Sequence, residues 1–128
     1  MNLNRLRVSE EVSLRLSHLK ARTGLTPNIL CRIGFCLSLN DLSIPNPEDY
    51  LPLSDREIDR HVLTGAWDQL FVALIKERCH QDNIIQEEIV EQFKAHVNRG
   101  VLLLYKQVKT ISDLRYILPK EYQTIAEV

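Results

Sequence analysis

Cysteine is scarce in this sequence of 128 residues, with only Cys31, Cys36 and Cys79 and no Cys-x-x-Cys pair. An odd number of cysteines at these spacings argues against a disulfide framework and against a structural zinc site. We therefore expect three reduced thiols, mostly buried, and no bound metal.

Long apolar runs and glycine-rich loops are also missing. No stretch approaches the roughly 20 residues that a membrane span needs, and the start, MNLNRLRVSE, lacks the apolar core of a signal peptide. We expect a cytoplasmic protein without a membrane anchor. The four glycines form no phosphate-binding loop, so ATP is not expected, and no other cofactor is predicted.

The formal net charge is only -1, but the charges are distributed unevenly along the chain. Residues 1–40 carry six Lys or Arg against two Asp or Glu, and residues 94–128 carry six against three, whereas residues 41–93 carry four against twelve. A fold that brings the basic ends together would concentrate positive potential on one surface and attract phosphates. The alternative is that the charges only solvate separate helix faces.

The apolar pattern predicts a single, mainly α-helical domain with a short N-terminal β-strand. Its expected parts are a strand-helix-helix unit at 1–40, a proline-rich loop at 41–63, a helical part at 64–118 and a tail at 119–128. Residues 2–8 alternate as in a half-exposed strand, with Leu3, Arg5 and Arg7 on its outer side. A lone strand leaves backbone groups unpaired, so this one must pair elsewhere in the chain or with a second copy.

Capping residues set the expected helix boundaries. Ser9 and Gly24 suit the two ends of a first helix, and Thr26-Pro27 suits the start of a second. The second helix, NILCRIGFCLSLN, is apolar on nearly every face, which favours an oligomer interface over a core within one chain. Further helices are expected to begin at Thr64, Asn83 and Ser112, and the longest should run from Asn83 to about Lys109.

The front of the chain resembles the ribbon-helix-helix arrangement over the residues LRVSEEVSLRLSHLKARTGLTPNILCRIGFCLSL. In such proteins two chains pair their strands antiparallel, and the outward side chains of the ribbon enter the major groove. The resemblance implies a dimer in which Leu3, Arg5 and Arg7 face DNA. Pairing with a second chain is therefore the favoured choice for the strand.

A broader resemblance covers residues 3 to 95. The stretch NRLRVSEEVSLRLSHLKARTGLTPNILCRIGFCLSL, the proline loop IPNPEDY and then EIDRHVLTGAWDQLFVALIKER look like the DndE family of the bacterial DNA phosphorothioation, or DNA sulfur modification, system. The resemblance implies a homo-oligomer, dimer or tetramer, that binds duplex DNA and nicked duplex in particular. It implies partners of three kinds: a sulfur-transferring PAPS-reductase-like protein, an ATPase-like protein and a cysteine desulfurase. A nicking activity is attributed to the family, whose system is related to restriction-modification.

The densest acidic cluster comprises Asp55, Glu57, Asp59 and His61, which makes these residues the weak candidates for catalysis. In an extended segment the four would share one face and could hold Mg²⁺, whereas in a helix Glu57 would point away from Asp55 and Asp59. The simpler interpretation is a solvated charged segment paired with nearby arginines. We assign no catalytic residue on this evidence.

Binding is better supported than catalysis. Arg99, Lys106 and Lys109 are predicted to lie on one side of the longest helix, opposite much of its apolar stripe. The candidate DNA-binding residues are Arg5, Arg7, Lys20, Arg22, Lys94, Arg99, Lys106 and Lys109. The sequence favours a non-catalytic DNA-binding subunit that holds phosphates while partner proteins carry out the sulfur chemistry. The alternatives are a structure-selective DNA nickase and a ribbon-helix-helix transcription regulator.

Overall fold

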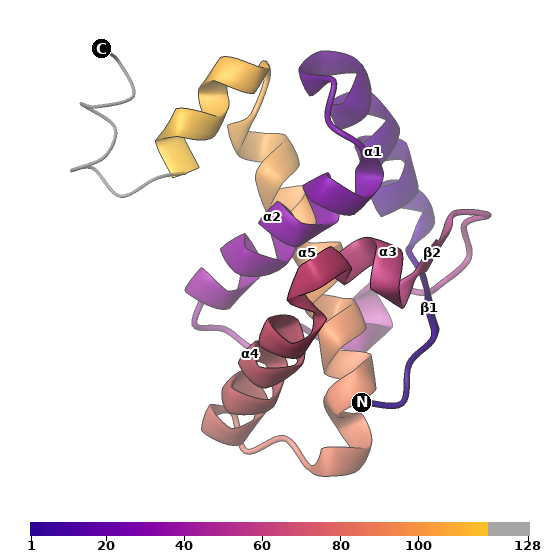
Figure 1. The fold of residues 1–128 in the computed structure, drawn as a ribbon, viewed down its shortest axis with the longest axis vertical. Coiled ribbons are helices and arrows are strands. Elements are labelled where there is room, and N and C mark those ends of the chain that lie inside the picture. The colour runs from indigo at the N-terminus through magenta and orange to yellow at the C-terminus, as the bar shows by residue number, and fades with distance from the viewer. Residues whose placement is uncertain (118–128) are drawn as a thin grey trace.

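Two helices, α2 (Pro27–Asn40) and α5 (Ile89–Gln107), cross at the centre of the molecule (Figure 1). The structure, a computed structural model, describes residues 1–117. The helices approach closely because Gly34 and Gly100 stand at the contact and neither carries a Cβ to hold the two backbones apart. The apolar helix α2 therefore buries one face within its own chain, beneath α5.

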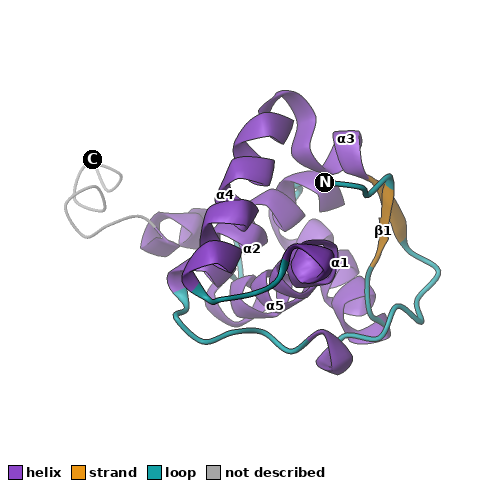
Figure 2. Ribbon diagram, turned by 90° about the horizontal axis from the view of Figure 1, so that it is seen from below, coloured by secondary structure: helices purple, strands orange, loops and turns teal. Residues whose placement is uncertain are grey.

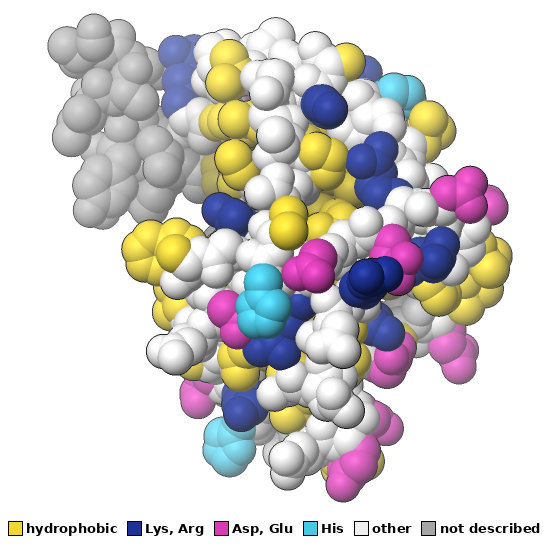
Figure 3. Space-filling view, turned by 45° about the vertical axis from the view of Figure 1, so that its right-hand side comes forward, with side chains coloured by type: hydrophobic (Ala, Val, Ile, Leu, Met, Phe, Trp, Pro, Cys, Tyr) yellow, Lys and Arg dark blue, Asp and Glu magenta, His cyan; other side chains and the backbone are white. Residues whose placement is uncertain are grey.

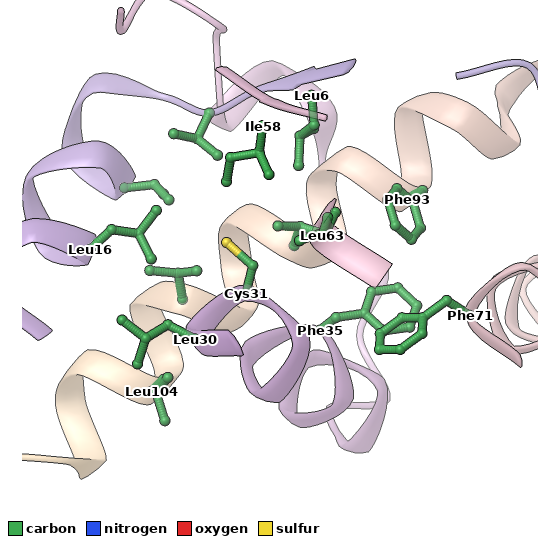
Figure 4. Close-up of a cluster of buried hydrophobic side chains, with 14 of the residues drawn as sticks. Leu6, Leu16, Leu30, Cys31, Phe35, Ile58, Leu63, Phe71, Phe93 and Leu104 are labelled. Carbon is green, nitrogen blue, oxygen red and sulfur yellow. The ribbon is translucent and has the colours of Figure 1, made fainter. Parts of the chain in front are cut away.

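The N-terminal strand is present as β1 (Arg5–Arg7), and it pairs antiparallel with β2 (Glu57–Asp59) of the same chain. Leu6 lies opposite Ile58, and both side chains point into the core (Figure 4). The two strands lie at one edge of the molecule (Figure 2). The prediction that this strand pairs with a second chain is wrong, because β2 supplies the partner. The outward placement of Leu3 is also wrong, since this side chain is only 7% exposed.

Helix α1 (Glu10–Thr23) begins and ends where its caps predict. Ser9 Oγ accepts a hydrogen bond from the backbone N–H of Val12, and Gly24 takes a left-handed conformation with φ of 76°. Pro27 is the first residue of α2, as expected from the Thr26-Pro27 pair. These boundaries are confirmed. They could be predicted because capping depends on residues close in sequence.

The proline-rich segment, predicted as a loop, contains regular secondary structure. It contains a 3₁₀ turn, η1 (Pro47–Asp49), then β2, and then the start of a short helix, α3 (Arg60–Thr64). The segment that carries the acidic cluster, for which the sequence fits both a strand and a helix, is thus a strand at Glu57–Asp59 and a helix from Arg60 onward.

Helix α4 (Asp68–Gln81) starts later than predicted, after a 3₁₀ turn, η2 (Gly65–Trp67). Thr64 ends α3 instead of capping α4, and its hydroxyl lies 2.9 Å from both the carbonyl oxygen of Arg60 and Oδ1 of Asp68. The hydroxyl is thus engaged by neighbouring groups and is not available as a cap.

The longest helix also begins later than predicted. Asn83 has φ of 57°, a left-handed turn conformation that cannot start a helix, and a 3₁₀ turn, η3 (Gln86–Glu88), precedes α5. Because α5 ends at Gln107, Lys109 lies beyond it. The expected last helix is a 3₁₀ helix, η4 (Ile111–Ile117). Leu118 and the tail at 119–128 lie outside the described residues.

The core is built around Phe35 of α2. Its ring centroid lies 5.3 Å from that of Phe71 on α4 and 5.2 Å from that of Phe93 on α5, in tilted arrangements typical of aromatic pairs (Figure 4). These contacts connect α4 to the central helix pair. Within residues 1–117, no helix combines the length and the apolar character needed to cross a membrane.

Candidate nucleic-acid interface

Helices α1 and α5 finish at one end of the molecule, where η4 follows (Figure 1). The sequence of these segments is rich in Lys and Arg. We call this surface the basic end, and it consists of Arg15, Lys20, Arg22, Lys106 and Lys109. The chain has no Asp or Glu between Val12 and Asn40, and none between Gln92 and Ser112. The two helix segments that build the basic end therefore bring no carboxylate to it.

The charge distribution is visible on the molecular surface. Figure 3 shows Lys and Arg side chains without acidic neighbours in the upper part of one face, whereas Lys, Arg, Asp and Glu side chains are mixed in its lower part. The carboxylate of Asp113 follows in η4, but it accepts hydrogen bonds from the backbone N–H groups of Lys109 and Thr110, at 2.8 and 3.0 Å. These hydrogen bonds hold the pKa of Asp113 below its usual range.

Tyr105 connects α5 to α1 within the basic end. Arg15 Nη1 and Arg22 Nη2 donate to its phenol oxygen at 3.3 and 3.4 Å, and the two guanidinium carbons lie 4.4 and 4.9 Å from the ring centroid. The hydrogen bond from Arg22 and the positive charges of Arg15, Arg22 and Lys109 hold the pKa of Tyr105 below its usual range. Among the described residues, no carboxylate forms an ion pair with Arg15 or Arg22.

Four of the predicted DNA-binding residues are carried by the segments that form the basic end: Lys20, Arg22, Lys106 and Lys109, all exposed. Arg5 is exposed on β1, away from them. Arg7 is held by Glu57 at 3.2 Å and by the carbonyl oxygen of Ser54 at 2.9 Å. Lys94 pairs with Glu91 at 3.2 Å. Arg7 and Lys94 therefore already have acceptors within the chain.

The predicted exposure of Arg99 is wrong, because this residue is only 9% exposed. Its guanidinium donates to Ser38 Oγ and to the carbonyl oxygens of Ser38 and Ser43, each at 2.9 Å. Sequence reasoning also missed Arg78, whose guanidinium donates to the carbonyl oxygens of Leu39, Asp41 and Ser43 at 2.7 to 2.9 Å. The two arginines satisfy carbonyl groups at the end of α2 and just after it, which is a structural role.

The four acidic-cluster residues do not converge on one site. Glu57 pairs with Arg7, and Asp59 Oδ1 accepts a hydrogen bond from the backbone N–H of His61 at 2.9 Å, so Asp59 caps α3. His61 is carried by α3 instead of the strand, and its Nδ1 lies 4.0 Å from Asp68. Within residues 1–117, no group of three or more His, Cys, Asp or Glu side chains has the arrangement needed to hold a metal ion.

The three cysteines are free thiols. Cys31 and Cys79 are buried, and burial raises the pKa of Cys31 to about 12. Cys36 is exposed, so the thiols are mostly buried, as predicted, and burial of part of the Cys36 side chain raises its pKa. The pKa of Cys79 is also raised by burial. A reactive cysteine needs a lowered pKa, because the thiolate is the reactive form, and none of the three has one.

An apolar groove of about 490 Å³ lies between the outer face of α2 and the start of α4. It is lined by Arg32, Ile33, Cys36, Leu37, Asn40, Trp67, Leu70, Phe71 and Ile117. Trp67 of η2 and Leu70 of α4 are 59% and 51% exposed. The outer face of α2 is therefore uncovered where the groove runs.

Arg15 and Tyr105 belong to the basic end, and sequence reasoning missed both. Two signals point to them. Arg15 and Arg22 stand seven residues apart on α1, which places them on one helix face, in a segment without Asp or Glu from Val12 to Asn40. Tyr105 lies in the acid-free stretch of α5 next to Lys106.

Comparison with known proteins places this fold in a family. The model of the family described as DNA sulphur modification protein DndE matches residues 5–112. A crystal structure of DndE from Escherichia coli B7A, involved in DNA phosphorothioation modification, is 27% identical, with a TM-score of 0.68 over 81% of this chain and 98% of that one. A mutant DndE involved in DNA phosphorothioation is 25% identical, with a TM-score of 0.65 over 81% of this chain and 99% of that one. No curated protein sequence matches. The family match spans most of the chain, and this chain belongs to the DndE family of DNA phosphorothioation proteins.

Proposed function

We propose that this chain is a non-catalytic DNA-binding subunit of the phosphorothioation machinery, which holds duplex DNA, and nicked duplex in particular, at its basic end. The observation that carries the proposal is the meeting of two acid-free segments, one from α1 and one from α5, at a single surface. Cations without nearby carboxylates remain available to neutralise phosphates, and such contacts supply most sequence-independent affinity for DNA.

The acidic cluster supports holding DNA over cutting it. Asp59 is a helix cap and Glu57 is paired with Arg7, so these side chains have structural tasks. In this proposal the sulfur-transferring PAPS-reductase-like protein, the ATPase-like protein and the cysteine desulfurase act on DNA that this subunit presents. Purified protein incubated with supercoiled plasmid and Mg²⁺ should leave the plasmid intact. Nicking that disappears in Asp59→Ala would instead favour the nickase.

The charge model is tested by measuring affinity for a duplex at several salt concentrations. The logarithm of the association constant should fall linearly with the logarithm of salt, and each cation removed should reduce the slope by about 1. The variants are Lys20→Gln, Lys106→Gln and Lys109→Gln. The matched control is Lys76→Gln, which removes an exposed lysine on α4. An affinity that hardly changes with salt would overturn the proposal, as would equal effects of Lys76→Gln and Lys106→Gln.

The preferred form of DNA needs a separate comparison. Intact, nicked and single-stranded DNA of one sequence should be measured at one salt concentration, with nicked duplex bound most tightly. Equal affinity for intact and nicked duplex would remove the preference for nicks but would leave the charge model in place.

We also propose that copies of the chain associate through the apolar groove beside α2. Exposed tryptophan and leucine side chains around an apolar groove are characteristic of interfaces, and several copies would multiply the phosphates held. Mass measurement in solution should give a dimer or tetramer for the native chain and a smaller species for Trp67→Lys with Leu70→Lys. A monomeric native chain would contradict this part.

A further inference from the structure

The cluster of Arg15, Arg22 and Tyr105 has more hydrogen-bond donors than acceptors. A phenol oxygen can accept two hydrogen bonds, and Arg15 and Arg22 each donate one to it. The phenol hydrogen and the four further N–H donors of each guanidinium are left for solvent or a ligand. Among residues 1–117, no other side-chain hydrogen bond is formed by Arg15 or Arg22, and no acceptor is placed on the phenol hydrogen. An anion with several oxygens would balance this cluster.

The two positive charges are also held together without compensation. Both guanidiniums lie over one aromatic ring, at 4.4 and 4.9 Å from its centroid, so neither can move away without losing that contact. Two positive charges placed on one ring repel each other, and no carboxylate among residues 1–117 pairs with either. The charge of Lys109 adds to the positive potential at the phenol oxygen. The arrangement is organised before any ligand arrives, which reduces the ordering cost of binding.

His18 adds a further unsatisfied polar group to the same place. Its ring centroid lies 6.1 Å from that of Tyr105, and its Nδ1 is buried without a hydrogen-bond partner. Buried polar atoms normally have partners, so one left open near the ring of Tyr105 is unusual. This observation is independent of the charge count.

We propose that Arg15, Arg22 and Tyr105 form a phosphate-binding site, in which the two guanidiniums and the phenol hydroxyl donate to the oxygens of one DNA phosphate. The geometry fits a phosphate because guanidinium presents paired N–H donors that match two oxygens of one group, which a lysine ammonium does not. The inference rests on the proposed function and deepens it, since it assigns one phosphate to a defined site within the basic end.

The test keeps the charge and removes the geometry. Arg15→Lys and Arg22→Lys retain the charge of the basic end but lose the forked donors, and Tyr105→Phe keeps the ring but loses the hydroxyl. Each variant should bind duplex DNA about tenfold more weakly, whereas the slope against salt should match that of the native chain. Lys76→Arg is the matched control, because it exchanges the same two groups at an exposed site on α4 outside the basic end, and it should bind as the native chain does.

Three DNA ligands distinguish the source of the phosphate: intact duplex, a nick with a 5′-hydroxyl and a nick with a 5′-phosphate. Equal losses on all three assign an internal phosphodiester, and a loss on the 5′-phosphorylated nick alone assigns a terminal phosphomonoester. Native affinity on all three ligands in all three variants overturns the site. If the native chain itself shows no salt-dependent binding, it is the proposed function that fails. Thermal unfolding identifies a variant that does not fold. Tyr105→Phe retains the packed ring, so a loss of binding in this variant reports the missing hydroxyl and not a failure to fold.

Discussion

A Cβ built on Gly100 would lie 1.8 Å from the carbonyl oxygen of Gly34, so the backbones of α5 and α2 touch where these residues meet. The neighbouring Phe35 N would be 2.8 Å away, and a Cβ on Gly34 would lie 2.8 Å from the backbone of Gly100 and Val101. Every nearby atom is backbone, so no flexible side chain can move aside. The central crossing depends on glycine at both positions.

Gly100→Ala should destabilise the protein by about 3 kcal/mol or more, because the helices must separate to admit one methyl group. The gain in helix propensity from Gly to Ala, about 1 kcal/mol, opposes this effect but is smaller. Urea unfolding measures the difference. Gly24→Ala is the control, since a Cβ there meets nothing within 4 Å and only the positive φ resists it, for about 1 kcal/mol. Equal losses in the two variants would contradict the crossing geometry.

Arg99→Lys should lower stability by about 2 kcal/mol while leaving DNA affinity unchanged in the folded fraction. A lysine ammonium cannot reach both Ser38 and Ser43, so carbonyl groups after α2 would lose their donors. Chemical unfolding and a duplex titration on the same samples give the two readings. Lys106→Ala should do the reverse, with native stability and weaker binding. A drop in affinity for Arg99→Lys without loss of stability would show that Arg99 contacts DNA.

Acid should weaken the fold through His96, which is fully buried, with Nδ1 hydrogen-bonded to Ser38 Oγ at 2.8 Å. Burial and the charges of Arg99 and Arg78 lower its pKa to about 4, whereas Asp82 and Asp41 act weakly in the other direction. Between about pH 6.5 and pH 4 the unfolded chain binds the proton and the folded chain does not, so stability falls as pH falls. The full loss is on the order of 3 kcal/mol. His96→Gln should be less stable at neutral pH but should lack this slope in unfolding experiments.

Asp59→Ala should cost about 1 kcal/mol, because it removes the acceptor that caps α3. Asp55→Ala changes a neighbouring exposed carboxylate outside β2 and α3 and should stay within about 0.5 kcal/mol of the native chain. Thermal unfolding of the two variants side by side measures the difference. Identical stabilities would mean that the carboxylate of Asp59 is not held as a cap.

The parts of the fold that could be predicted from sequence are local. The ends of α1 follow from Ser9 and Gly24, whose effects act within one helical turn. The partner of β1 could not be predicted, because β2 has only three residues and a charged sequence that fits a helix equally well. The pairing is decided by Leu6 and Ile58, which share the core although they are far apart in the chain.

Arg99 shows why helix periodicity was insufficient for the candidate site. The pattern placed this residue opposite the apolar stripe of α5, but every residue from Ala95 to Val101 is buried. Periodicity identifies the most apolar face of a helix and does not reveal that other segments cover the polar face as well. The absence of carboxylates around Lys20 and Lys106 can be read from the sequence. The hydrogen bond from Arg15 to Tyr105 cannot, because only the tertiary fold brings these two residues together.

The pairing of β1 with β2 separates folding from assembly. In a ribbon shared between two chains, a monomer has an incomplete sheet, and dilution unfolds it. Here the strand finds its partner inside the chain, so each copy reaches its native topology alone. Dissociation of the proposed oligomer would therefore release folded monomers, and exchange between monomer and oligomer would require no chain to refold.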